Sequence, residues 1–300
     1  MNKSIFSVWL KTARPKTLPL ALASILVGAA LAFSVGSFNI MTTSLALITT
    51  ILLQVLSNFA NDYGDHIKGS DTAERIGPLR AIQQGEITKT QLKKAIYILI
   101  GLSLFSGLSL IIYAYQSLQD IIAFSALGIL AIICAITYTV GKKPYGYMGL
   151  GDISVLMFFG FLAVLGTFYL QAHYLSFVIF FPAFSCGLLS VAVLNINNLR
   201  DINQDRLAGK NTLVVRIGSK NGRIYHSILL TLAVVFYLLF AISTEQSWSG
   251  FLFLITLPLL IKHALKVYRH QDPNELRPLL GQMAGIALIT NLMFSIGIMI

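Results

Sequence analysis

Residues 39–71 read NIMTTSLALITTILLQVLSNFANDYGDHIKGSD, and this stretch joins an apolar segment directly to a cluster of acids. The part up to residue 60 is long and apolar enough to cross a bilayer core of about 30 Å as a helix. The carboxylates of Asp62, Asp65 and Asp71 follow at once. Charged groups beside lipid are costly, so a cluster of them there indicates a functional site.

A second apolar stretch ends in the same way. Residues 195–205 read NINNLRDINQD and close the apolar run that begins near residue 174. The spacing Asn-x-x-x-Asp occurs in both stretches, as Asn58 with Asp62 and as Asn197 with Asp201. The two copies hint at a diverged internal repeat, although little else in the two halves matches.

The whole chain has the composition of a membrane protein. Hydrophobic residues make up 56% of its 300 positions and charged residues only 11%, whereas about a quarter of a typical soluble domain is charged. Runs of roughly 20 apolar residues, the length of a membrane-spanning helix, recur along the chain. We therefore expect an all-α fold, a single polytopic membrane domain over residues 1–300 with nine transmembrane helices near 17–36, 39–60, 95–115, 119–140, 150–171, 174–197, 225–243, 248–268 and 279–299.

Lysine and arginine residues alternate with these expected spans. They precede the first span, occupy every second connection after it and lie at the end of the eighth span, while the remaining short connections have none. Basic loops stay on the cytoplasmic side of a membrane, so we expect a cytoplasmic N-terminus, cytoplasmic long loops and an outside C-terminus. The formal net charge of +10 follows from this asymmetry, and no nucleic-acid partner is expected.

The spacing of the acids predicts that they act in pairs. Asp62 and Asp65 are three apart and Asp201 and Asp205 are four apart, so each pair lies on one face of a helix, where like charges repel. A cation relieves that repulsion, and Mg²⁺ prefers one or two carboxylates together with phosphate oxygens. Two facing clusters therefore predict two Mg²⁺ ions that hold a diphosphate. The expected ligands are Asp62, Asp65, Asp71, Asp201, Asp205, Asn58 and Asn197, with Asp62, Asp65, Asp201 and Asp205 as the catalytic residues. The alternative is that these are ordinary helix-end acids in solvated loops.

Basic residues in the same loops are candidates for binding phosphate. Arginine can hold a phosphate through two hydrogen bonds and lysine acts as a point charge. The candidates are Lys68, Arg75, Arg80, Lys142, Arg200 and Lys210, of which Arg200 and Lys142 have the most favourable positions. The alternative for each is a positive-inside residue near the headgroups. Tyr138 is a further candidate for substrate contact. The ring faces of Tyr138, Tyr145 and Tyr147 could stabilise a cation, although we favour a membrane-belt interpretation for all three.

Five strings give the chain a resemblance to a known family: RPKTLPLA (14–21), ANDYGDHIKGSD (60–71), RIGPLRAIQQGEIT (75–88), TYTVGKKPYGYMGLGDISV (137–155) and LNINNLRDINQDRLAGKNTLVVRIG (194–218). With these motifs the chain resembles the UbiA superfamily of intramembrane prenyltransferases, and most of all its branch that prenylates 1,4-dihydroxy-2-naphthoate on the bacterial route to menaquinone. One departure is that Gly69 stands where the general first motif places its third Asp, and Asp71 follows two residues later.

The resemblance implies a reaction and its partners. A polyprenyl group would pass from polyprenyl diphosphate, held by Mg²⁺, to 1,4-dihydroxy-2-naphthoate. Carbon dioxide and diphosphate would be lost and demethylmenaquinone formed. The enzyme would lie in the lipid bilayer of the bacterial inner membrane. Two alternatives stay open: another aromatic acceptor such as 4-hydroxybenzoate, and a cation-coupled transporter, although transporters place their acids nearer the bilayer midplane.

Overall fold

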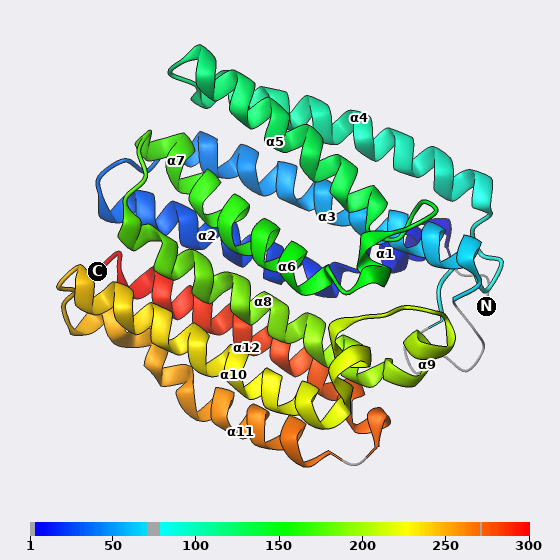
Figure 1. The fold of residues 1–300 in the computed structure, drawn as a ribbon. Coiled ribbons are helices and arrows are strands. Elements are labelled where there is room, and N and C mark those ends of the chain that lie inside the picture. The colour runs from blue at the N-terminus through cyan, green and yellow to red at the C-terminus, as the bar shows by residue number, and fades with distance from the viewer. Residues whose placement is uncertain (1–3, 71–78, 271) are drawn as a thin grey trace.

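The computed structural model describes residues 4–70, 79–270 and 272–300, and in these ranges every regular element is helical. Within this part of the chain, nine helical segments are long and apolar enough to cross a membrane, which confirms the predicted all-α polytopic fold. The helices lie side by side, with the described N-terminal and C-terminal residues at opposite ends of the assembly (Figure 1).

The helices follow one another as α1 (Ile5–Ala13), α2 (Leu18–Ser34), α3 (Ile40–Lys68), α4 (Lys89–Ala114), α5 (Leu118–Thr137), α6 (Gly151–Val155), the π-helical segment η3 (Leu156–Leu165), α7 (Gly166–Ala172), α8 (Phe180–Arg200), α9 (Ile202–Leu207), α10 (Leu213–Ser243), α11 (Leu257–Arg269) and α12 (Leu276–Gly297). Short turns of 3₁₀ helix join them as η1 (Pro15–Thr17), η2 (Tyr145–Met148), η4 (Phe177–Ile179), η5 (Trp248–Thr256) and η6 (Pro273–Glu275).

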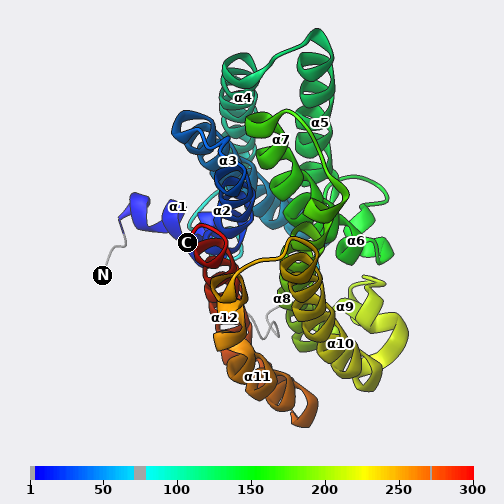
Figure 2. The ribbon, with the colours of Figure 1, turned by 90° about the vertical axis from the view of Figure 1, so that its left-hand side faces the viewer.

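The largest buried core surrounds α8. This helix packs against α10, η3 and α12, and the view along the helices places α2 and α8 between α4 and α5 on one side and α10 and α11 on the other (Figure 2). Leu189 of α8, Phe168 of α7 and Phe294 of α12 are fully buried in this core. Apolar side chains that are buried on every side hold the central helices in a fixed arrangement.

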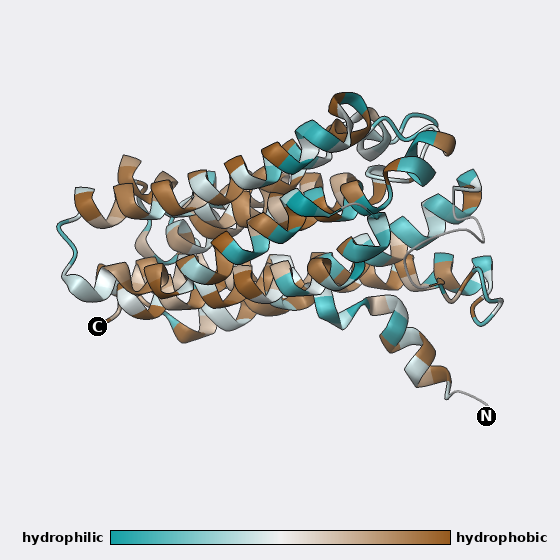
Figure 3. Ribbon diagram, turned by 90° about the horizontal axis from the view of Figure 1, so that it is seen from below, coloured by the Kyte–Doolittle hydropathy of each residue, from teal (hydrophilic) through white to brown (hydrophobic). Residues whose placement is uncertain are grey.

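The outer helices present apolar side chains to their surroundings. Phe105 and Ile112 of α4 are 73% and 65% exposed, and Ile122 of α5 is 61% exposed. Most hydrophilic residues gather at the end of the assembly that carries the N-terminus (Figure 3). An exposed apolar belt below a polar end is the distribution that a bilayer-spanning protein requires.

Several helix ends lie beyond the expected spans. Helix α3 continues to Lys68 rather than ending near residue 60, and α10 begins at Leu213 rather than near residue 225. Polar residues continue both helices because a helix outside the membrane remains hydrogen-bonded along its own backbone. Helix α1 was not predicted; Ser4 caps its start by accepting from the Ser7 N–H, and Arg14 ends it with a φ of 54°.

Candidate active site

The first acidic pair lies on the last turns of α3. Asp62 and Asp65 are buried, with only 2% and 3% of their surface exposed, and share one helix face as their spacing predicts. Gly69 caps the helix in the left-handed conformation, with its N–H donating to the backbone oxygens of Asp65 and His66. The carboxylates therefore come from a rigid helix rather than from a flexible loop.

Two arginines neutralise this pair. Arg80 is buried and places Nη1 3.1 Å from Oδ1 of Asp62 and Nη2 2.7 Å from Oδ2 of Asp65. Arg14, at the end of α1, also pairs with Asp62. A buried carboxylate without a partner would cost several kcal/mol, so these contacts offset much of the cost of burying both acids.

A tyrosine and a lysine complete the surroundings of Asp65. The Tyr147 hydroxyl donates to Oδ1 of Asp65 at 2.7 Å, and Lys210 Nζ lies 3.2 Å from the same oxygen. Burial, and then the negative charge of Asp65, raise the pKa of Tyr147, so its hydroxyl stays protonated and remains a donor. The ammonium groups of Lys210 and Lys68 lie 4.9 Å and 5.3 Å from the centre of the Tyr147 ring.

The second acidic pair lies where α8 passes into α9. The backbone of Asp201 (φ −97°, ψ 10°) separates the two helices, but the Asp205 N–H still donates to the Asp201 oxygen at 2.8 Å, so the pair remains one helical turn apart. Arg200 binds both oxygens of Asp201, at 2.7 Å and 2.5 Å. Its Nη2 also donates to Oδ1 of Asn197 at 2.8 Å.

Lys210 joins the two clusters. Besides its contact with Asp65, its Nζ lies 3.9 Å from Oδ1 of Asp205. Carboxylates that are far apart in sequence therefore share one ammonium group at one end of the helical assembly. They lie at the end of α3 and in α9, directly after α8, and not in the middle of a span, which does not fit the midplane site expected of a transporter.

The remaining expected residues have different surroundings. The Asn58 amide donates to the Ala13 oxygen at 2.9 Å and to Oγ1 of Thr17 at 3.2 Å, so it ties α3 to the turn after α1 and is not equivalent to Asn197. Lys142 is exposed, and no described acid pairs with it. Asp71 and Arg75 lie outside the described residues.

Tyr138 follows α5 and contacts the loop that carries Tyr147, because the Gly146 N–H donates to its backbone oxygen at 3.0 Å. Its ring makes an edge-to-face contact with Tyr145, with 5.2 Å between ring centres. Burial, and then the negative charge of Asp152, raise the pKa of Tyr138, with smaller contributions from Asp205 and Asp65. Proximity to acids of both clusters keeps Tyr138 a candidate for substrate contact.

Three residues near the site make contacts with acids or with a tyrosine that the sequence did not predict. Arg14 was assigned only to the positive-inside pattern, and the membrane-belt interpretation of Tyr147 is wrong because its hydroxyl binds Asp65. Asp152 is a buried carboxylate at the start of the fifth span, and it accepts from the Tyr225 hydroxyl at 3.2 Å. A carboxylate that begins an apolar run, as in GLGDIS, is the signal that would have indicated Asp152.

The side-chain oxygens of the two acidic clusters suit a magnesium ion that also binds phosphate. Carboxylate and amide oxygens are the hard ligands that Mg²⁺ prefers, and Lys210 shows that a cation is accommodated between the two clusters. Among the described residues, no group of three acids, histidines or cysteines is placed to hold an ion on its own. This arrangement suits Mg²⁺, which usually keeps waters and phosphate oxygens among its ligands.

Comparison with known proteins defines the class. The profile of the UbiA prenyltransferase family matches residues 21–289, and the chain belongs to this family. It is 60% identical over 295 residues to 1,4-dihydroxy-2-naphthoate octaprenyltransferase of Haemophilus influenzae, covering 98% of this chain and 96% of that protein. It is 56% identical over 290 residues to the protein of the same name from Escherichia coli, covering 97% and 94%.

Solved structures share the fold at low sequence identity. The apo structure of a UbiA homolog from Aeropyrum pernix K1 matches with a TM-score of 0.70 at 15% identity, covering 95% of this chain and 98% of that one. A UbiA homolog from Archaeoglobus fulgidus, bound to DMAPP and Mg²⁺, matches with a TM-score of 0.64 at 16% identity, covering 96% and 99%.

Proposed function

We propose that this protein transfers a polyprenyl group from polyprenyl diphosphate to 1,4-dihydroxy-2-naphthoate, with loss of carbon dioxide and diphosphate, to give demethylmenaquinone. The observation that carries the proposal is the convergence of Asp65 and Asp205 on Lys210, because it brings two carboxylate pairs and a cation to one site. The names of the relatives at 60% and 56% identity support the choice of acceptor and suggest an octaprenyl donor.

Magnesium would be held by the acids of both clusters. Asp62, Asp65, Asp201 and Asp205 are the proposed ligands, and Asp71 is a further candidate. When bound, Mg²⁺ would neutralise negative charge on the departing diphosphate. Two ions would match the two clusters, and the Archaeoglobus homolog bound to DMAPP and Mg²⁺ supports the metal.

The basic residues would bind the diphosphate group itself. Arg80, Arg14 and Lys210 already lie against the acids, and Lys68 lies over the Tyr147 ring. As the bond between the allylic carbon and oxygen breaks, negative charge grows on the diphosphate, and fixed cations in a poorly solvated site stabilise it. Arg200 would act indirectly by orienting Asp201, to which it donates two hydrogen bonds.

The helical assembly would supply a dry environment for the allylic carbon. Water would otherwise capture a developing carbocation, so its exclusion determines the product. We place the acids and their loops on the cytoplasmic side of the bacterial inner membrane, because the long loops that carry the acids also carry most of the basic residues. An aromatic acceptor made in the cytoplasm would reach the site from that side while the prenyl tail stays in lipid.

Product identification tests this proposal directly. The full chain is placed in lipid nanodiscs with Mg²⁺ and octaprenyl diphosphate, and either 1,4-dihydroxy-2-naphthoate or 4-hydroxybenzoate is added. The expected result by mass spectrometry is prenylated, decarboxylated naphthoate and little prenylated hydroxybenzoate. Prenylated hydroxybenzoate as the main product would show that the acceptor is wrong, and steady ion flux without any prenyl diphosphate would contradict the enzyme class.

A further inference from the structure

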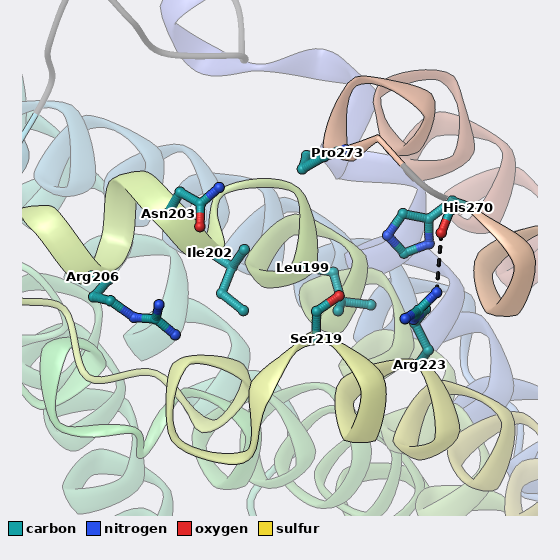
Figure 4. Close-up of a pocket in the computed structure, with 8 residues that line it drawn as sticks. All are labelled: Leu199, Ile202, Asn203, Arg206, Ser219, Arg223, His270 and Pro273. Carbon is teal, nitrogen blue, oxygen red and sulfur yellow. Dashed lines mark hydrogen bonds between the residues drawn. The ribbon is translucent and has the colours of Figure 1, made fainter.

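A cationic cavity lies beside α9, and neither Asp201 nor Asp205 lines it. It has a volume of about 340 Å³ and is walled by Leu199, Ile202, Asn203, Arg206, Ser219 and Arg223 (Figure 4). These residues come from the end of α8, from α9 and from the first part of α10. Among the described residues, two guanidinium groups line this space and no carboxylate does.

Arg223 is held in place by backbone oxygens. Its Nη1 donates to the oxygens of Tyr268 and His270, at 3.2 Å and 3.0 Å. No described residue accepts a hydrogen bond from its Nε or Nη2. The guanidinium is therefore held in one orientation by Nη1, while Nε and Nη2 can still donate to a ligand. A guanidinium with fixed orientation and free donors is suited to an oxyanion, which it binds through two hydrogen bonds.

Arg206 faces the cavity from the opposite wall. It follows Asp205 directly, and while Asp205 contacts Lys210 at the active site, the Arg206 side chain extends into the cavity (Figure 4). No described acid pairs with Arg206. Because two like charges that share a cavity repel each other, an anion placed between them would be favoured by both.

The backbone of α10 adds a third feature. Gly218 has φ 81° and ψ 162°, which breaks the helix, so Ser219 begins a new helical segment and its side chain lines the cavity. The first N–H groups of a helix lack internal acceptors and favour negative charge. Two arginines, a serine hydroxyl and a helix start therefore converge on one small space.

We propose that this cavity is a second anion site, separate from the acidic clusters, that binds a phosphate or diphosphate group through Arg206, Arg223 and Ser219. The group can come from free inorganic diphosphate or from the headgroup of an acidic phospholipid. An adjoining groove of about 820 Å³ supports the second source: it runs along apolar residues of α11 such as Ile261 and Leu265, and it shares His270 with the cavity. Its lining carries three basic residues, Lys262, Lys266 and Arg269, against one acid, Glu275. The proposal does not depend on the catalytic activity.

The test compares two variants that remove one positive charge each. Arg206→Gln removes a cavity arginine, and Lys220→Gln removes an exposed lysine that follows Ser219 and does not line the cavity. Binding of inorganic diphosphate to the full chain is measured by calorimetry in EDTA, in nanodiscs of zwitterionic lipid. We expect Arg206→Gln to weaken binding by about tenfold or more, since a charged hydrogen bond is lost, and Lys220→Gln to bind as the wild type does. Ser219→Ala should weaken binding less.

A second measurement distinguishes the source of the phosphate. Native mass spectrometry of protein from nanodiscs that contain phosphatidylglycerol counts the lipids that stay bound. If the wild type does not bind diphosphate but retains an anionic lipid that Arg206→Gln loses and Lys220→Gln keeps, the ligand is a lipid headgroup. The proposal is overturned if neither probe binds, or if both variants weaken binding equally, because the arginine would then contribute only general positive charge. Thermal unfolding of each variant verifies that the fold is intact.

Discussion

The ammonium nitrogen of Lys210 lies 3.2 Å from Oδ1 of Asp65, and this contact connects the loop after α9 to the end of α3. The same nitrogen is 3.9 Å from Oδ1 of Asp205. Two helix ends that are remote in sequence are thus held at one point by a single side chain. Lys142, which has the more favourable position in the sequence, is exposed and has no such contact among the described residues.

Replacing Lys210 by Met should impair substrate binding. The substitution keeps the length of the side chain but removes the charge between Asp65 and Asp205, while Arg80 still pairs with Asp65. We expect kcat/KM for polyprenyl diphosphate to fall about tenfold or more, because a charged contact is lost. Steady-state kinetics in nanodiscs measure the effect, with Lys142→Met as the matched control. Equal losses in both variants would argue against the bridging role of Lys210.

Carboxamides at the acids should remove activity and keep the shape of the site. Asp65→Asn and Asp205→Asn should each lower turnover by about 100-fold or more, beyond the 10–100-fold typical of residues outside the ligand shell. Asp120→Asn is the control at the opposite end, since Asp120 caps the start of α5 by accepting from the Gln116 and Ser117 N–H groups. It should lower stability, by about 0.5–2 kcal/mol, and leave turnover per folded molecule unchanged. If Asp65→Asn turned over substrate as fast as the wild type, Asp65 could not be an essential metal ligand.

Gly64 should not tolerate a side chain. It stands between Asp62 and Asp65, and a Cβ there would lie 2.7 Å from both the carbonyl oxygen and Oγ1 of Thr139. Gly64→Ala should therefore displace the Thr139 backbone or the end of α3, at a cost of about 1–3 kcal/mol, and lower turnover as well. Gly128→Ala on α5 has open space around its Cβ and should be neutral or slightly stabilising. Thermal unfolding and activity measurements on both variants decide the point.

Removal of divalent metal should stop the reaction reversibly. Activity is expected to disappear in EDTA and to return when Mg²⁺ is added in excess, with Mn²⁺ as a substitute, because hard oxygen ligands accept both ions. The measurement is product formation before and after dialysis. Undiminished product formation in EDTA would show that the acids act without a metal.

Single cysteines should report the orientation of the protein. Lys143→Cys lies at the end with the acids and Ser247→Cys at the other end, and both positions are exposed. The positive-inside pattern places Lys143 in the cytoplasm. A membrane-impermeant maleimide should thus label Ser247→Cys in intact cells and Lys143→Cys only in inverted vesicles, relative to the parent with Cys134 and Cys186 alone. Labelling of both from one side would contradict the three spans, Gly151–Ala172, Phe177–Arg200 and Leu213–Ser243, that separate the two positions.

The membrane-spanning helices could be predicted from the sequence because each span is recognised from its own run of apolar residues. Apolar runs of the right length predict α4 or α8 without knowledge of their neighbours, and the three-residue spacing of Asp62 and Asp65 predicts their shared face. The end of α3 was predicted too early and the start of α10 too late, because hydropathy marks where lipid ends and a helix can continue beyond that point.

The partners of the acids could not be predicted in the same way. The contacts of Arg14 with Asp62 and of Tyr147 with Asp65 join segments that are distant in sequence, and only the packed chain brings them together. Asn58 and Asn197 share a spacing to the following Asp, yet one binds the turn after α1 and the other binds Arg200. Equal spacing fixes the place of a side chain on its own helix but not the neighbour that it meets.

The ion pairs at the acids have a consequence for how the protein is made. Arg14, Arg80, Lys210 and Arg200 supply the counter-charges for the four carboxylates from within the chain. Insertion and folding in the membrane therefore need no ion to hold this end of the helices together, unlike small domains whose folding free energy comes from a bound metal. We therefore expect the folded protein to be stable in the bilayer without magnesium, and the metal to affect substrate binding and turnover rather than folding.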